Sequence, residues 1–246
     1  MRNLTSLTRA LGRRFSQLVG PGGKKPSSTP ANCRAPRVRP HGDLFPPIEE
    51  ELGPFRHYFK GNVLNAGSGH RDIRHLVEGR LFNQDLPALA PNPNVDIFSP
   101  LHEIPIEDAF FDAIICNAVL EHVANPEEIM REFQRVCKPD GILYLAVPFM
   151  QPEHLCPTDY QRYTIDGLQS LVRKHNFVVI KAEGIHSVYT TVGWICTEWC
   201  QAATGLDRLI LRWLLLPYLH AKAKRSRLHV PTVASTYRVL ARRSAT

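Results

Sequence analysis

The chain has 246 residues, of which 43% are apolar and 22% charged, a size and composition sufficient for one α/β domain with a buried core. The formal net charge of +7 is unevenly placed, because residues 1–42 hold nine Lys or Arg and no acid, while the remainder holds 21 basic and 23 acidic residues. This distribution argues against a basic nucleic-acid-binding face on the domain itself.

The first segment, residues 1–19, can form an amphipathic helix. Five apolar residues recur there at helical spacing among arginines: Leu4, Leu7, Leu11, Phe15 and Leu18. The segment lacks the continuous apolar core of a secretory signal, so a mitochondrial transit peptide, a helix on an anionic membrane and a poorly ordered basic tail all stay open. Residues 20–47 are rich in Pro, Gly and Ser. We therefore expect a flexible leader and linker over 1–47, ahead of a domain at 48–246.

Apolar runs and helical patterns then alternate along the chain. After one or two short helices that begin near Ile48, strands are predicted at 63–66, 80–84, 95–98, 112–116, 142–147, 177–182 and 236–241. Longer helices are predicted at 126–137 and 165–174. This alternation predicts an α/β fold with a doubly wound, mainly parallel sheet, in which ligands bind beyond the carboxyl ends of the strands.

Residues 185–228 do not continue the alternation. The stretch 206–219 is strongly apolar, but charged residues and a proline interrupt it, so it is too short to span a bilayer. Basic residues follow it: Lys222, Lys224, Arg225 and Arg227. Two interpretations stay open, a helical insertion that covers the substrate side of the core and an element that lies at a membrane interface. In the second case, 1–19 and 206–227 would make peripheral membrane contact.

Four motifs occur in a characteristic order. They are VLNAGSG at 63–69, FDAIICNAVLEHV at 111–123, RVCKPDG at 135–141 and VPF at 147–149. With this order and spacing, residues 62–175 resemble the class I S-adenosylmethionine (SAM)-dependent methyltransferases, and within them the type 11 group with its VLEHV motif. The resemblance implies a seven-stranded, Rossmann-like methyltransferase sheet with SAM as cofactor.

Six residues are candidates for binding SAM. They are Asn65, Gly67, Gly69, Asp85, Ser99 and Asn117. The two glycines suit a turn that lets the backbone approach the cofactor closely, and Asp85 follows the second strand, where a carboxylate can accept hydrogen bonds from both ribose hydroxyls. Asn117 would face the methionine end. Asp85 could instead cap a turn, and Asn117 could cap a helix.

Two of these residues depart from the pattern of the resembling group. Many relatives carry an acid where this chain has Asn65, and many carry an acid for the adenine amino group where this chain has Ser99 or Pro100. We expect Asn65 to substitute through hydrogen bonds, and Ser99 or a backbone carbonyl to substitute for the acid that meets the adenine.

The loop at 148–164 resembles the PFxxxxHxxPxDYxRYT stretch of the same group. Its His154 is a candidate general base, because the unperturbed pKa of histidine is close to neutrality. Asp159 could orient His154 or pair with Arg162, and Arg162 could bind an anionic acceptor. A purely structural Asp159–Arg162 ion pair is the alternative. Glu121 is expected to stabilise the start of a helix, and His122 to pack. No metal site is predicted.

These observations favour a SAM-dependent methyltransferase that transfers a methyl group to a small-molecule or lipid- or glycan-linked acceptor, most simply by O-methylation. The loss of acids at Asn65 and Ser99 motivates an alternative, a non-catalytic assembly or binding factor with the same fold. Nucleic-acid methylation is disfavoured, because NAVL stands at 117–120 where many base-methylating relatives have an N/D-P-P-Y/F tetrad.

The cellular location is predicted only in outline. Six scattered cysteines without a C-x-x-C pair indicate reduced thiols in a reducing compartment. We expect a cytoplasmic protein at the periphery of a membrane or, alternatively, a mitochondrial one.

Overall fold

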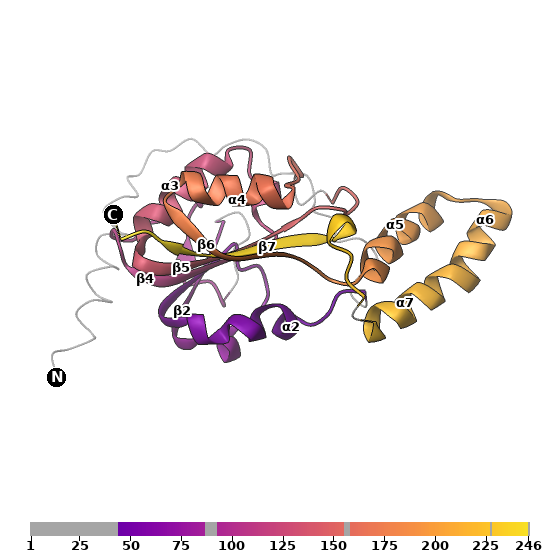
Figure 1. The fold of residues 1–246 in the computed structure, drawn as a ribbon, viewed down its shortest axis with the longest axis horizontal. Coiled ribbons are helices and arrows are strands. Elements are labelled where there is room, and N and C mark those ends of the chain that lie inside the picture. The colour runs from indigo at the N-terminus through magenta and orange to yellow at the C-terminus, as the bar shows by residue number, and fades with distance from the viewer. Residues whose placement is uncertain (1–43, 87–92, 155–157, 227, 246) are drawn as a thin grey trace. The chain divides into compact units, whose positions relative to one another are not determined.

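The computed structural model describes residues 44–86, 93–154, 158–226 and 228–245. The predicted amphipathic segment 1–19 and nearly all of the predicted linker therefore lie outside the described residues. The same holds for Cys33, Cys156 and Arg227. Figure 1 shows the fold.

A seven-stranded sheet organises the domain, with the strand order β3-β2-β1-β4-β5-β7-β6. The strands are β1 Lys60–Ala66, β2 Glu78–Asp85, β3 Ile97–Phe98, β4 Phe111–Asn117, β5 Cys137–Pro148, β6 Phe177–Ile185 and β7 Thr236–Arg243. All neighbouring pairs are parallel except that β7 runs antiparallel to both β5 and β6. The predicted doubly wound, mainly parallel seven-stranded sheet is confirmed.

Several element boundaries differ from the predicted ones. Helix α3, Pro126–Val136, ends one residue before the predicted end, because Cys137 is already extended and pairs with Phe111 of β4. Strand β1 begins three residues earlier than predicted, at Lys60. Its first residues are exposed or half-buried, so they carry no apolar signal although their backbone pairs with β2.

Helices cover the sheet on both faces (Figure 1). Helix α3 and helix α4, Ile165–Lys174, lie on one face, where buried Phe133 and Leu168 join one core cluster. The short helix α2, Ile48–Leu52, and the 3-10 helix Gly53–Tyr58 lie on the other. Leu52 and Phe55 of these helices, with Phe59 directly after them, pack in a second core cluster with Val63 and Tyr144 of the sheet.

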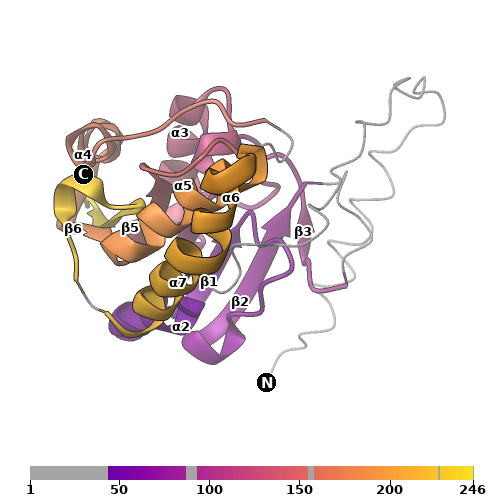
Figure 2. The ribbon, with the colours of Figure 1, turned by 90° about the vertical axis from the view of Figure 1, so that its right-hand side faces the viewer.

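Three helices connect β6 to β7 and form the helical insertion. They are α5 Val188–Ala202, α6 Gly205–Ile210 and α7 Leu216–Arg225, with a π-helical turn at Leu211–Leu215. Strand β7 is antiparallel to both β5 and β6, so β6 runs parallel to β5 and ends at the carboxyl edge of the sheet, where β7 begins. The insertion between them therefore lies at the carboxyl edge of the parallel strands. Figure 2 views the domain from this side. Among the described residues, no helix is long and apolar enough to cross a membrane.

The four described cysteines are free thiols: Cys116, Cys137, Cys196 and Cys200. Burial raises the pKa of Cys137 to about 12, and burial also raises the pKa of Cys116. Both thiols therefore stay protonated at neutral pH and act as core residues, as their strand positions predict.

Candidate functional site

A glycine turn follows β1 at the carboxyl edge of the sheet. Gly67 and Gly69 both have left-handed backbone angles, with φ of +63° and +58°. A Cβ at Gly67 would lie 2.5 Å from Cγ2 of Val119, whereas a Cβ at Gly69 would meet no atom of the described residues within 4 Å. At Gly67 the turn thus packs tightly against Val119, just after β4. At Gly69 the space that a side chain would occupy is free of atoms of the described residues, so a ligand could approach the backbone there.

The end of β2 holds this turn through two side chains. The amide of Gly67 donates to Oε1 of Gln84 over 3.0 Å, and the amide of Gly69 donates to Oδ2 of Asp85 over 2.8 Å. The other carboxylate oxygen, Oδ1, accepts from the amide of Leu86, so Asp85 does cap its own turn. Because a carboxylate has about four acceptor positions, this buried group can still accept hydrogen bonds from a ligand's hydroxyls.

Ser99, just after β3, carries an unsatisfied polar group. Its amide donates to the carbonyl of Asp85 over 3.1 Å, and its carbonyl accepts from Nε2 of Gln84 over 2.6 Å. The Oγ atom is buried and has no hydrogen-bond partner among the described residues. A buried hydroxyl without a partner costs free energy, so Ser99 is a position where a ligand could supply the missing hydrogen bond.

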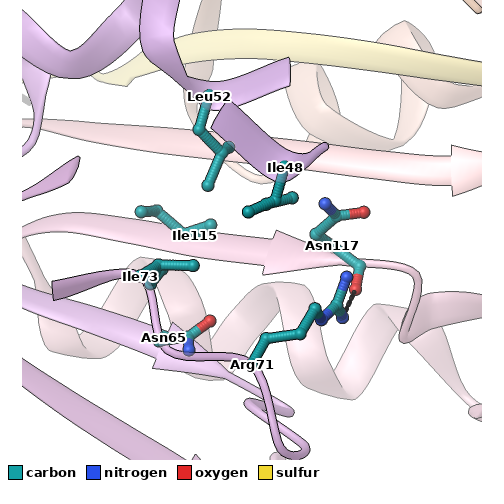
Figure 3. A pocket seen from close by; sticks show the side chains of 7 residues that line it. All are labelled: Ile48, Leu52, Asn65, Arg71, Ile73, Ile115 and Asn117. Carbon is teal, nitrogen blue, oxygen red and sulfur yellow. Dashed lines mark hydrogen bonds between the residues drawn. The ribbon is translucent and has the colours of Figure 1, made fainter. Parts of the chain in front are cut away.

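A small pocket lies beyond the ends of β1 and β4 (Figure 3). Its lining residues are Ile48, Leu52, Asn65, Arg71, Ile73, Ile115 and Asn117. Nη2 of Arg71 donates to the carbonyl of Asn117 over 2.9 Å, and Nδ2 of Asn117 donates to Oε2 of Glu51 over 3.2 Å. The pocket therefore combines an apolar wall from α2 with one cationic side chain, and the Glu51 carboxylate lies behind Asn117, an arrangement that suits a zwitterionic group.

Asn65, where relatives often have an acid, also belongs to this pocket. Its Nδ2 donates to Oδ1 of Asn83 over 2.9 Å, and Nδ2 of Asn83 donates in turn to the carbonyl of Asn94. An ionised carboxylate at position 65 could not donate to Asn83, so the amide fits this buried chain of hydrogen bonds.

The three predicted catalytic residues lie together in the loop after β5. Asp159 forms a bidentate ion pair with Arg162, and its Oδ2 also accepts from the amide of His154 over 3.0 Å. The hydrogen bonds from Arg162 lower the pKa of Asp159 to about 2. Arg162 donates further to the carbonyls of Gln161 and Pro152. Its guanidinium is thus occupied within the loop, which favours a structural ion pair over binding of an anionic acceptor.

A second group, formed by Glu121, His122 and His154, lies against this loop. Glu121 lies in the first turn of the 3-10 helix Leu120–His122, close to a helix start as the sequence predicts, and it is fully buried. Its Oε1 is 3.6 Å from Nε2 of His154 and 3.7 Å from Nε2 of His122. The Glu121 carboxylate raises the pKa of His154. Trp194 of α5 contacts the His154 ring, with the ring centroids 5.7 Å apart.

The sequence patterns do not predict every residue of the site. Gln84 and Arg71 carried only weak signals, a polar residue at a strand end and a cation just after the G-x-G turn. Glu51 carried none, because α2 reaches Asn117 only in the folded chain.

Parts of the amino-acid sequence match known proteins. Residues 87–145 match the family model described as a methyltransferase domain, of type 11. A protein in transposon TN4556 of Streptomyces fradiae, described as an uncharacterized 37.1 kDa protein, is 30% identical over 88 residues. That match spans 36% of this chain and 23% of the other, so the chain covers under a quarter of this relative's length.

Solved structures share the fold at low sequence identity. A SAM-dependent methyltransferase from Archaeoglobus fulgidus is 17% identical, with a TM-score of 0.51 and coverage of 80% of this chain and 93% of that one. The 1,6-didemethyltoxoflavin-N1-methyltransferase from Burkholderia thailandensis, solved with S-adenosylhomocysteine, is 17% identical, with a TM-score of 0.52 and coverage of 83% and 79%. The cyclase SpnF is 16% identical, with a TM-score of 0.53 and coverage of 81% and 80%.

The strand order, the motif-bearing turns and these matches agree with one another. The chain has the class I methyltransferase fold, and its segment 87–145 matches the model of a type 11 methyltransferase domain.

Proposed function

We propose that the protein is a SAM-dependent methyltransferase. The observation that carries the proposal is the open turn at Gly69, tied to the buried carboxylate of Asp85 over 2.8 Å. SAM needs a backbone that it can approach closely and an acid for its ribose diol, and this pair offers both. The neighbouring Ser99 hydroxyl, which has no partner among the described residues, suits a contact with the adenine.

The methionine end of SAM would occupy the pocket of Figure 3. Arg71 is placed to bind the carboxylate of the cofactor, and Glu51 to accept from its ammonium group. Asn65 and Asn117 would complete the polar contacts with carbonyl and amide atoms. Bound there, SAM would supply an activated methyl group close to the region where Trp194 of the insertion contacts His154 of the loop after β5.

The reaction we propose is O-methylation. The acceptor hydroxyl loses its proton, its oxygen forms a bond with the methyl carbon, and the bond from that carbon to sulfur breaks to leave S-adenosylhomocysteine. The sulfonium is already a good leaving group, so the protein's tasks are alignment and removal of the proton. We assign removal of the proton to the group formed by Glu121, His122 and His154.

We propose further that the acceptor is a lipid- or glycan-linked molecule, or a small molecule that partitions into membranes. The support comes from α6, the π-helical turn and α7, here named the apolar–basic surface, residues 206–225. Its large apolar side chains exposed by a third or more are Leu206, Leu209, Ile210, Trp213, Leu214 and Tyr218. Exposed apolar side chains flanked by lysines and arginines favour binding at an anionic lipid surface.

Calorimetric titration of the purified chain with SAM tests the cofactor site. We expect binding that weakens tenfold or more in Asp85→Ala, equivalent to about 1.4 kcal/mol or above. Asp166→Ala, which removes a carboxylate from the exposed first turn of α4, is the matched control and should leave the affinity unchanged. A folded protein that binds no SAM would overturn the enzymatic proposal.

That outcome would favour the second candidate, a non-catalytic factor that uses the methyltransferase fold for binding. The specific observation behind it is Asn65, which replaces an acid that many relatives have. The fold itself does not guarantee methyl transfer, since the solved neighbour SpnF is described as a cyclase.

A further inference from the structure

Three side chains near the end of β4 present metal-binding atoms to one another. One carboxylate oxygen of Glu121 and one ring nitrogen each of His122 and His154 lie within 4.8 Å of one another. From Oε1 of Glu121, the two Nε2 atoms are 3.7 and 3.6 Å away. Ligand atoms bound to one zinc ion at about 2.0–2.1 Å in tetrahedral geometry are roughly 3.3–3.4 Å apart, so the two distances from Glu121 differ from those of a coordination site by only a few tenths of an ångström.

The two imidazoles are oriented by their other ring nitrogens. Nδ1 of His122 lies 2.5 Å from the carbonyl oxygen of Thr158, and Nδ1 of His154 lies 3.3 Å from that of Pro152. A carbonyl can only accept, so each Nδ1 carries a hydrogen, and in the neutral form of each ring Nε2 keeps the lone pair that binds an ion. Histidine ligands of metal ions characteristically have this outer hydrogen bond, which fixes ring orientation and tautomer.

Glu121 supplies an independent indication of a missing ligand. Its side chain is 1% exposed, and neither carboxylate oxygen has a hydrogen-bond partner among the described residues. A buried carboxylate without a hydrogen bond is poorly compensated, because burial removes the water that would otherwise solvate its charge. A divalent cation between the three atoms would compensate that charge and form three coordination bonds.

We propose that Glu121, His122 and His154 bind a divalent first-row transition-metal ion of the zinc class. Two imidazoles and one carboxylate suit such an ion better than Mg²⁺ or Ca²⁺, which prefer all-oxygen ligands. Three protein ligands leave a coordination position for an oxygen of the acceptor or water, and an oxygen bound there has a lowered pKa. This catalytic consequence rests on the proposed function, whereas binding of the ion does not.

The test uses the full chain, stripped with a chelator and then titrated with Zn²⁺ and, separately, Co²⁺ without SAM. We expect one equivalent to bind with a Kd below about 10 μM, Co²⁺ to give visible absorption bands of a four- or five-coordinate site, and Zn²⁺ to raise the Tm. Glu121→Gln and His154→Gln should each weaken binding at least 100-fold and remove the shift in Tm. Gln keeps the size of the Glu side chain, so Glu121→Gln should still fold.

Two controls separate this site from other donors. His75→Gln disrupts an exposed histidine–carboxylate pair, in which Nε2 of His75 is 2.9 Å from Oε1 of Glu49, and should leave binding unchanged. Cys196→Ser/Cys200→Ser removes two thiols four residues apart on α5 and should also retain the equivalent. Folded wild-type protein that binds no ion, or binding that survives Glu121→Gln and His154→Gln, would overturn the proposal. Because SAM is absent, neither result depends on the proposed cofactor site.

Discussion

The amide of Gly69 donates to the carboxylate of Asp85 over 2.8 Å, which joins the turn after β1 to the end of β2. The same carboxylate accepts from the amide of Leu86 on its other oxygen. Asp85 therefore orders both turns between which a ligand would bind. Its loss should affect the shape of the site as well as its charge, so the two glycines need variants of their own.

Gly67→Ala and Gly69→Ala should have different effects. Both place a Cβ on left-handed backbone, which costs roughly 1–2 kcal/mol. At Gly67 the Cβ would also meet Val119 at 2.5 Å, and such overpacking costs about 1–3 kcal/mol more. Urea unfolding should thus show a larger loss of unfolding free energy for Gly67→Ala, while Gly69→Ala should chiefly weaken SAM binding.

The SAM affinity of Gly69→Ala decides whether the cofactor binds beside this glycine. If Gly69→Ala binds SAM with wild-type affinity, the open space beside Gly69 is not where the cofactor approaches the backbone.

Ser99→Ala separates ligand binding from stability. The buried Oγ of Ser99 has no partner among the described residues, so removing it should change the unfolding free energy by less than about 0.5 kcal/mol or raise it. If the hydroxyl contacts the adenine, the Kd for SAM should rise about 3- to 10-fold, as expected for one hydrogen bond of roughly 0.5–1.5 kcal/mol. Calorimetry and urea unfolding measure the two quantities, and an unchanged Kd would remove Ser99 from the proposed site.

The sequence could predict those parts of the site that are local in the chain. Gly67, Gly69 and Asp85 stand directly at strand ends, and a parallel sheet brings strand ends together whatever the loops do. Arg71 and Glu51 could not be predicted in the same way, because they reach Asn117 across 46 and 66 residues of chain.

The burial of Glu121 could not be predicted from the sequence for a different reason. The sequence predicts an acid at the start of a helix, and Glu121 does lie in the first turn of the 3-10 helix Leu120–His122, but the motif carries no signal of its burial. Its burial follows from the return of the loop after β5, where the amide of Tyr160 donates to the carbonyl of Glu121 over 2.7 Å. Neither periodicity nor motif spacing encodes that packing.

Trp213 and Leu214 should control binding to lipid vesicles. Each side chain is 70% exposed on the apolar–basic surface. Full burial of a large apolar side chain contributes about 1.5–3 kcal/mol, so the double variant Trp213→Ser/Leu214→Ser should lose at least tenfold in partitioning to vesicles that contain anionic lipid. Co-sedimentation with vesicles at rising salt would measure it.

Val178→Ser is the matched control for the vesicle experiment. Val178 is 61% exposed but lies on β6, outside the apolar–basic surface. Equal losses in both variants, or no binding by the wild type, would contradict a membrane contact through residues 206–225.

The Asp159–Arg162 pair should behave as a structural ion pair with a defined pH dependence. The Asp159 side chain is 2% exposed, and Arg162 lowers its pKa to about 2, below the unfolded value of about 3.9. The pair's stabilisation is therefore complete above about pH 4 and is lost as the pH falls toward 2. Arg162→Ala leaves a buried carboxylate unpaired and should cost about 3–5 kcal/mol at pH 7.

Urea unfolding at pH 7 and at successively lower pH measures this dependence. The difference between wild type and Arg162→Ala should shrink as acid removes the pair from the wild type, and Asp159→Asn/Arg162→Ala should recover part of the loss at pH 7, because it removes the buried charge. Arg173→Ala, which breaks only an exposed hydrogen bond to Gln169, should change stability little. If Arg162→Ala is as stable as the wild type but loses methyl transfer, Arg162 binds the acceptor, and the structural interpretation is wrong.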